Sequence, residues 1–396
     1  MKNVIKKVGS LALSAVLTLG VFTAQSTNVS ALSLKDNNGV NCNVKSLINK
    51  SGAGDCTAIV IGSNKIVIDA GKESGASTIK HLTKGEPKDN AFITASSWEK
   101  INNSEKKRTK TITIDHLILT HSHDDHTGGL EPLTDWVEDD VYVCKKDGYK
   151  FYENRRVVVK NLYYNGVYTS AHDGQTKVWE FVANTDVKNF YIFPAWDAKG
   201  IIDQGTKKFF SDIKQYNKKV NYVPAESKIK DIYLSGTNCT LSIIPALHTY
   251  TGLGDIWNEN DSSMSAIIYD RNQAFKLIFL GDMGGRPIRE INTATDVRHY
   301  AFTGYLTNGT AFKKVYIKAP HHGKRSGFTK YNNNNIDYSK DFKDFYEKTI
   351  KPTKIIGTIW GGTEKNVIAE NAKNGLEYYT NNISNFASYR LDTWGN

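Results

Sequence analysis

The sequence lacks any apolar run long enough to cross a bilayer. Its one sustained apolar stretch, residues 9–22, is shorter than the roughly 18 to 20 residues that a transmembrane helix needs. No internal repeat of fixed period is present, which excludes solenoids and propellers. With 39% hydrophobic and 23% charged residues, the composition excludes disorder, collagen and coiled coil. An ordinary globular protein is expected.

Cysteine is also scarce. The four cysteines show no CxxC spacing, which argues against a structural zinc site. Four thiols in 396 residues are too few to be a scaffold on which the fold depends. An even number permits disulfides outside the cell without requiring them, so the pairing stays open. The residues are Cys42, Cys56, Cys144 and Cys239.

The N-terminal apolar stretch has the pattern of a secretory signal. Lys2, Lys6 and Lys7 precede it, and it leads to the small-residue sequence Val29-Ser30-Ala31. We therefore predict a signal peptide over residues 1–31 and a secreted, extracellular protein. Its removal lowers the formal charge from +10 to +7, because the segment carries three lysines and no acid. A basic exported protein favours anionic partners such as nucleic acid, teichoic acid or lipid headgroups.

The remaining chain is predicted to be one α/β domain over residues 42–396. A hairpin is expected at Cys56–Ile61 and Lys65–Asp69, and a buried strand at Ile112–Thr120 after a polar, Lys-rich stretch. Residues 141–235 are interpreted as an elaboration on the core, with Lys177–Val182 as one of its strands. Further strands are expected at Thr240–Ile244, Met264–Tyr269, Lys276–Leu280, Lys314–Lys318 and Lys354–Ile359, with a helix at Asp341–Ile350. Two separated halves predict two sheets sandwiched between helices.

The segment LTHSHDDHTGGL, residues 119–130, follows the buried strand directly. In an extended loop, residues i and i+2 point to the same side, so His121 and His123 can present two imidazoles to one metal ion. Asp125 and His126 can then turn toward a second ion. Gly128 and Gly129, the next glycines along, fit a tight turn where backbone comes close to the site.

Two later strands also end in ligand-type residues. Leu277–Leu280 runs into Gly281-Asp282, and Val315–Ala319 runs into Pro320-His321-His322-Gly323. Sites in open α/β architectures form at the carboxyl ends of strands. Each ending is weak evidence alone, but together with the histidine cluster they predict a metal centre.

These motifs resemble those of the metallo-β-lactamase fold superfamily. The similarity runs from about Asn43 to the C-terminus and rests on HxHxDH at 121–126, VIDAG at 67–71, FLGD at 279–282 and APHHG at 319–323. It implies an αββα four-layer sandwich. More narrowly, GAGDCTAIVI before VIDAG, Asn260 to Ser263 as N-x-x-S, and HHG after a Lys-bearing strand are similar to the hydrolase domain of the competence protein ComEC and to secreted phosphorylcholine esterases. Those relatives cleave phosphodiesters or are proposed to do so.

Carried onto this chain, the resemblance implies two divalent metal ions, zinc first and manganese as the alternative. His121 and His123 hold the first ion, Asp125 and His126 the second, Asp282 bridges them, and His322 completes the second site. His321 is then available to contact a substrate oxygen, so His321 and Asp125 are the residues expected in catalysis. Asp69 would lie beneath the cluster and orient a ligand imidazole, with capping of the Gly71 turn as the alternative role. The choice between His321 and His322, and a ligand role for His248, stay open.

Two divalent ions about 3.5 to 4 Å apart lower the pKa of a bridging water and clamp both oxygens of a displacement. Phosphodiester hydrolysis suits such a site. A lactone or β-lactam hydrolase is the less favoured alternative, since lactamases of this fold generally have a metal-binding Cys where Asp282 stands. A metal-bearing surface-binding protein without activity is a further alternative, which the complete ligand set disfavours.

The substrate is indicated only by composition. Basic clusters at Lys106-Lys107-Arg108, Arg155-Arg156 and Lys324-Arg325 could track nucleic acid or a cell-wall phosphodiester polymer such as teichoic acid. Aromatic residues could instead form a cage for the quaternary ammonium of phosphorylcholine, and they are Trp179, Phe181, Tyr191, Phe193, Trp196 and Trp257. Nucleic acid is favoured, because a basic pair follows HHG directly. The oligomeric state stays open.

Overall fold

The structure is a computed structural model. It describes residues 30–46, 55–72, 82–137, 140–165, 173–193, 211, 215, 219–226, 228–247, 260–293, 297–307, 312–323 and 338–356. The predicted signal peptide lies outside these residues except for Ser30 and Ala31, which begin the first strand. No helix in the described part of the chain is long and apolar enough to span a membrane.

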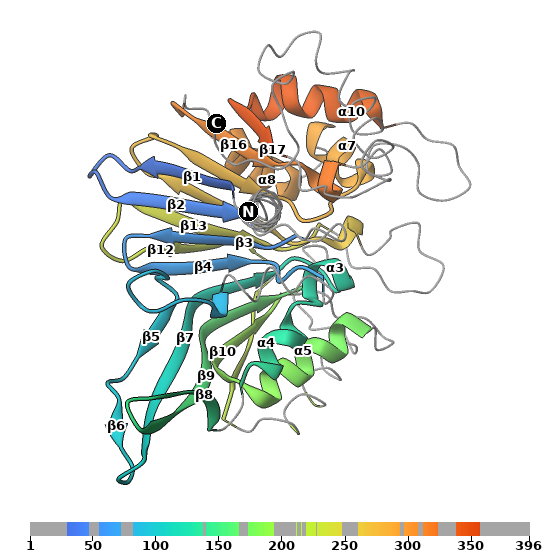
Figure 1. Ribbon diagram of the computed structural model, residues 1–396. Helices are drawn as coiled ribbons and strands as arrows, with labels where there is room; N and C mark the ends of the chain where they lie inside the picture. The colour runs from blue at the N-terminus through green and yellow to red at the C-terminus, as the bar shows by residue number, and fades with distance from the viewer. Residues whose placement is uncertain are drawn as a thin grey trace, which may run out of the picture.

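Strands in the first half of the chain form one large mixed sheet (Figure 1). Its first four strands pair antiparallel in chain order: β1 (Ser30–Lys35), β2 (Asn41–Ser46), β3 (Thr57–Ile61) and β4 (Asn64–Ile68). Four parallel neighbours extend it, namely β7 (Glu105–Leu119), β9 (Tyr149–Tyr164), β10 (Asp186–Ile192) and β11 (Asn221–Pro224). Short strands β5 (Ile93–Ala95) and β6 (Glu99–Lys100) pair with β7, and β8 (Val141–Lys146) pairs with β9.

The second half forms a smaller sheet. Four of its strands pair antiparallel, namely β12 (Lys230–Tyr233), β13 (Cys239–Ile244), β14 (Ser265–Asp270) and β15 (Lys276–Phe279). Two parallel strands complete it, β16 (Val315–Lys318) and β17 (Lys354–Ile356). Since β4 is parallel to β7 and β15 to β16, the residues that follow these strands collect at common sheet edges.

Helices cover the outer face of each sheet (Figure 1). Helices α3 (Asp124–Thr127), α4 (Leu130–Asp135) and α5 (Asp173–Asn184) belong to the first half. Helices α7 (Gly285–Thr293), α8 (Val297–Thr307) and α10 (Ser339–Asp344), with a 3-10 turn η1 (Asn260–Ser262), a 3-10 turn η2 (Pro320–Gly323) and a π-helical turn η3 (Phe345–Ile350), belong to the second.

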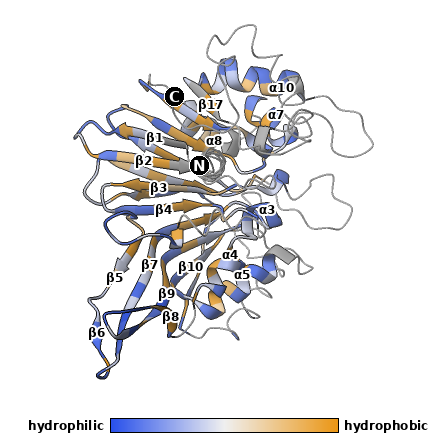
Figure 2. Ribbon diagram, in the orientation of Figure 1, coloured by the Kyte–Doolittle hydropathy of each residue, from blue (hydrophilic) through white to orange (hydrophobic). Residues whose placement is uncertain are grey.

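Three buried apolar clusters hold these layers together. One joins α4 and α5 to the first sheet through residues such as Leu133 and Phe181. A second contains Ile59 of β3 and Leu241 of β13, and so lies between the two sheets. The third joins the second sheet to its helices through residues such as Ile288. Hydrophobic residues are concentrated along the strands between the helical layers (Figure 2). The short strand β6 and the start of β7, which pairs with it, are largely hydrophilic. The predicted order of helix, sheet, sheet and helix is thus present.

Most predicted strands agree with the structure, and two predictions were wrong, the strand at residues 177–182 and the start of the strand at residue 112. Residues 177–182 lie in α5 and are helical, because Val178, Phe181 and Val182 recur at the i, i+3, i+4 spacing of a buried helix face. Within residues 141–235, for which an elaboration is predicted, β9 and β10 are strands of the first sheet. The Lys-rich stretch before Lys110 is the first part of β7, a 15-residue strand. The four cysteines form no disulfide.

Candidate metal centre

The histidine motif begins where β7 ends. Leu119 is the last residue of β7, and His121 is completely buried just beyond it. The imidazole ring of His121 lies 4.7 Å from that of His123 and 4.1 Å from that of His126, measured between ring centroids. Asp125, half-buried in α3, has its Oδ1 3.9 Å from His126 Nε2. The structure therefore brings together all four residues of the predicted motif.

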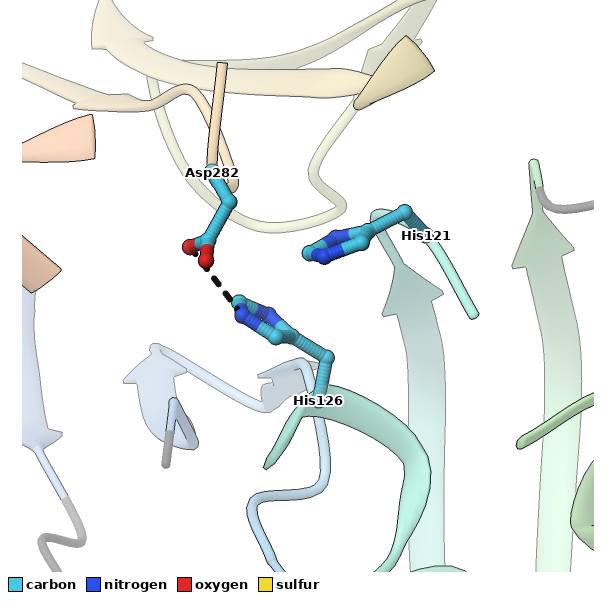
Figure 3. A group of neighbouring side chains, drawn as sticks. All are labelled: His121, His126 and Asp282. Atoms are coloured by element: carbon cyan, nitrogen blue, oxygen red, sulfur yellow. Dashed lines mark ion pairs between the residues drawn. The ribbon is translucent and has the colours of Figure 1, made fainter. Parts of the chain in front are cut away.

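Asp282 comes to this cluster from the other sheet. Its Oδ1 lies 3.0 Å from His126 Nε2 (Figure 3). One potential ligand atom each from His121, His126 and Asp282 lies within 4.8 Å of the other two, and all three residues are buried. A carboxylate facing two imidazoles from separate elements is the donor set expected for divalent zinc or manganese.

Asp69 lies beneath the cluster, where the sequence predicted it. Its Oδ2 is 2.8 Å from His126 Nδ1, and its Oδ1 accepts hydrogen bonds from the backbone N–H and the hydroxyl of Thr120 at 2.8 and 3.0 Å. The hydroxyl of Thr120 lies in turn 3.1 Å from His121 Nδ1. Asp69 thus contacts one imidazole directly and a second one through Thr120.

This arrangement fixes the tautomer of His121. The Thr120 hydroxyl gives its one proton to Asp69, so it can only accept from His121, and His121 Nδ1 must be the donor. Burial, reinforced by the neighbouring His126 and His123, lowers the pKa of His121 well below its ordinary value. A neutral imidazole protonated on Nδ1 presents the lone pair of Nε2 to the centre of the site.

His126 has the opposite electrostatic environment. Although burial lowers its pKa, the carboxylates of Asp282 and Asp69 raise it, and the net effect places the pKa of His126 well above its ordinary value. A protonated imidazole between two buried carboxylates marks a place where positive charge is stabilised. A bound divalent cation would take over that role from the proton.

The residues fit a divalent metal ion. His121 Nε2 is buried and has no hydrogen-bond partner among the described residues. Leaving a buried nitrogen unsatisfied costs about 1 to 3 kcal/mol, and metal coordination removes this cost. The donor set of imidazole nitrogens and carboxylate oxygens suits zinc and manganese.

The HHG segment also reaches the cluster. His321 is buried, adopts a left-handed backbone conformation with φ of 49°, and has Nε2 3.9 Å from Asp282 Oδ2. The side chain of His322 and the whole of His248 lie outside the described residues, so their roles stay predictions. His321 therefore lies beside Asp282 at the centre.

Two glycines allow the close backbone approaches. A Cβ atom on Gly129 would lie 2.0 Å from the carbonyl oxygen of Ala70, and the Gly129 N–H donates to Gly71 at 2.9 Å. Gly281 has φ of 59°, and a Cβ there would lie 2.8 Å from the Thr120 hydroxyl. Only glycine fits at these positions without displacing its neighbours.

Sequence reasoning missed several residues of the site. They are Thr120, Ser263, whose hydroxyl accepts from the Asp282 N–H at 3.1 Å, and the buried pair Asp55 and Lys318. Each lies inside or beside a motif of the sequence. Thr120 belongs to THSH, Ser263 to N-x-x-S and Asp55 to GAGD, and Lys318 ends the strand before HHG. The motifs were noted, but their individual side chains could not be assigned without the contacts between the two sheets.

The two basic clusters that lie in the described part of the chain do not surround the centre. Lys106, Lys107 and Arg108 lie near the start of β7, about 40 Å from its end at ~3.3 Å per residue. Much of their charge is already balanced. Lys107 pairs with Asp140, Arg108 with Glu86 and Glu153, Arg155 approaches Glu153, and Arg156 pairs with Asp186. Lys324 and Arg325 lie outside the described residues.

The described aromatic residues do not form a cage. Phe181 belongs to the cluster under the outer helices, and Trp179 packs against it. Phe193 lies between the two sheets, with Tyr191 packed against that cluster. The two pairs are thus separated by the sheet itself, and Lys230 Nζ already lies 3.6 Å from the centre of the Tyr191 ring.

Residues 50–198 match the sequence model of a family described as the metallo-beta-lactamase superfamily. The match includes the histidine motif and Asp69. Together with the two sheets between helices, it confirms the predicted metallo-β-lactamase fold. No curated protein matches the chain.

Three solved structures are similar in fold. They are YhfI of Bacillus subtilis (11% identity, TM-score 0.37, 84% of this chain and 92% of that one), unliganded yeast PDE1 (10%, 0.37, 87% and 94%) and the metallo-beta-lactamase GOB-18 of Elizabethkingia meningoseptica (15%, 0.29, 83% and 94%). At identities this low, none of them indicates a substrate for this chain.

Proposed function

Because residues 50–198 match the metallo-beta-lactamase superfamily model, we propose that this protein is a metal-dependent hydrolase that cleaves phosphodiesters. The observation that carries the proposal is the buried convergence of His121, His126 and Asp282, with ligand atoms within 4.8 Å of one another. The carboxylate of Asp282 supports phosphodiester cleavage over β-lactam cleavage, since lactamases of this fold generally have Cys there. The motifs similar to the ComEC hydrolase domain support the same choice.

Six residues would hold two divalent ions: His121, His123, Asp125, His126, Asp282 and His322. Bound there, the ions would lower the pKa of a water molecule and neutralise the charge of a phosphoryl group. The chain's own contribution is orientation. Asp69 directs His126 and, through Thr120, His121, while His321 lies close enough to Asp282 to contact a substrate oxygen.

Nucleic acid is the substrate that we propose first. Support comes from Lys324 and Arg325, which follow HHG directly in the sequence. A phosphorylcholine or teichoic-acid ester is the second candidate. The phosphorylcholine ester loses support because the described aromatic residues lie on opposite faces of the first sheet.

Metal analysis and one substitution test the proposed chemistry. The purified protein should contain two zinc or manganese ions per chain and hydrolyse bis-nitrophenyl phosphate. Asp282→Asn should abolish turnover and lower the metal content without loss of folding, because the carboxylate would bridge the ions. Asp186→Asn, which changes a partly exposed carboxylate on β10, is the matched control. A metal-free wild-type protein with full activity, or turnover of a chromogenic β-lactam alone, would contradict the proposal.

Salt dependence tests the substrate. Cleavage of single-stranded DNA and of a phosphorylcholine ester should be compared between about 50 and 200 mM salt, where binding of a polyanion weakens by orders of magnitude. Lys324→Ala/Arg325→Ala should reduce DNA cleavage, whereas Lys106→Ala/Lys107→Ala should not, because the latter cluster lies about 40 Å from the centre. Intact DNA together with a cleaved choline ester would reverse the ranking.

A further inference from the structure

A buried ion pair lies directly beside the candidate metal centre. Lys318, the last residue of β16, pairs with Asp55, and each residue is 3% exposed. Lys318 Nζ also donates to the Gly281 carbonyl at 3.1 Å and lies 3.6 Å from Asp282 Oδ1. The ammonium group therefore contacts the turn that carries Asp282.

Asp55 also contacts the histidine motif of the centre. Its N–H donates to the carbonyl oxygen of Asp125 at 2.9 Å. One of its carboxylate oxygens lies within 4.8 Å of ligand-type atoms of Asp69 and His126. Asp55 therefore links the histidine motif of the first sheet to Lys318 of the second.

The position of Lys318 creates an electrostatic conflict. A fixed positive charge 3.6 Å from Asp282 Oδ1 competes with any cation that binds the same carboxylate. In a buried setting, water screens this competition poorly. Asp55 offsets the charge, because its carboxylate forms the closest contact of the ammonium group.

We propose that Asp55 is a positioning residue of the metal centre: it neutralises Lys318, which contacts the Gly281–Asp282 turn, so that Asp282 stays available to the metal. This inference rests on the proposed function, since it presupposes that Asp282 binds a divalent ion. A purely structural ion pair would behave differently. Its loss would lower stability without changing metal affinity in a charge-dependent way.

Three variants distinguish a positioning role from a purely structural role of this ion pair. In each variant, zinc affinity is measured by competition against a chromophoric chelator. Asp55→Asn leaves the ammonium without its counter-charge and should weaken zinc binding about 10- to 100-fold, the usual effect of losing a residue that supports a ligand. Lys318→Met removes the competing charge and should bind zinc at least as tightly as the wild type. Asp55→Asn/Lys318→Met removes both charges and should return affinity to within a few-fold of the wild type.

Lys276→Met is the matched control. Lys276 is another buried lysine of the same sheet, 1% exposed, but its Nζ donates to the carbonyls of Tyr305 and Leu306 rather than to the site. Its substitution should leave zinc affinity unchanged. Urea unfolding of each metal-free variant shows whether it folds. If Asp55→Asn does not fold, Lys318→Met and the double variant decide, since replacing both partners of a buried pair is often tolerated.

The outcomes are distinguishable. Wild-type zinc affinity in Asp55→Asn, or a tenfold loss in Lys318→Met, would overturn the inference while leaving the hydrolase proposal intact. A wild-type protein that binds neither zinc nor manganese would instead overturn the proposed function itself.

Discussion

Thr120 links Asp69 to His121, and its replacement by valine isolates that link. Valine has nearly the same shape as threonine, so Thr120→Val leaves no cavity at this fully buried position. The backbone N–H of residue 120 still donates to Asp69 at 2.8 Å. The substitution therefore removes only the hydroxyl, with its bonds to Asp69 and His121.

The expected magnitude follows from those two contacts. A hydrogen bond to a charged group contributes about 1.5 to 3 kcal/mol and a neutral one about 1 kcal/mol, so the free energy of unfolding should fall by about 3 kcal/mol. His121 Nδ1 keeps only the Ser263 hydroxyl at 3.4 Å, which is too long to hold the ring. Zinc affinity should therefore fall by about 10- to 100-fold.

Chelator competition measures the affinity, and urea unfolding of the metal-free protein measures the stability. Thr120→Ser keeps the hydroxyl and should bind zinc nearly as tightly as the wild type. If Thr120→Val binds zinc within about twofold of the wild type, the deduced hydrogen-bond relay does not orient His121. The assignment of the His121 lone pair would then be wrong.

Three further predictions address other parts of the chain. Burial lowers the pKa of His116 to about 4 from 6.5, so the unfolded chain binds a proton that the folded chain does not. The contribution of His116 to the free energy of unfolding should therefore be fully present above pH 6.5 and should fall by about 3 kcal/mol as the pH is lowered toward 4. His116→Gln should remove this pH dependence from the unfolding free energies measured in urea. The same pH dependence in the wild type and in His116→Gln would contradict the prediction. Gly129→Ala should lower the free energy of unfolding by about 3 kcal/mol in the same assay, because its Cβ would collide with the carbonyl oxygen of Ala70. Gly304→Ala is the control, since this position on α8 is open and the substitution should not lower the free energy of unfolding. Finally, N-terminal sequencing of protein from the culture medium should begin at Leu32; a cytoplasmic protein beginning at Met1 would refute the predicted signal peptide.

The sequence determined where ligand-type residues meet the ends of strands. Buried strands are recognisable as short apolar runs, and His121, Asp282 and His321 follow β7, β15 and β16 within three residues. The strand endings together with the family resemblance placed His121 and Asp282 in one predicted site, because β7 and β15 belong to different sheets and are not joined by strand pairing. Within 141–235 the pattern failed, because Val178, Phe181 and Val182 suit a strand by residue type but a helix by spacing.

Only the tertiary structure decided how the site is supported. Asp55 and Lys318 lie far apart in the sequence, and their pairing depends on how the first sheet packs on the second. The same holds for the relay from Asp69 through Thr120 to His121, which needs the parallel register of β4 and β7. Composition likewise does not reveal that Arg108 is paired or that Phe181 and Phe193 face opposite sides of a sheet. Local pattern fixes which residues follow a strand, but long-range register fixes which of them touch.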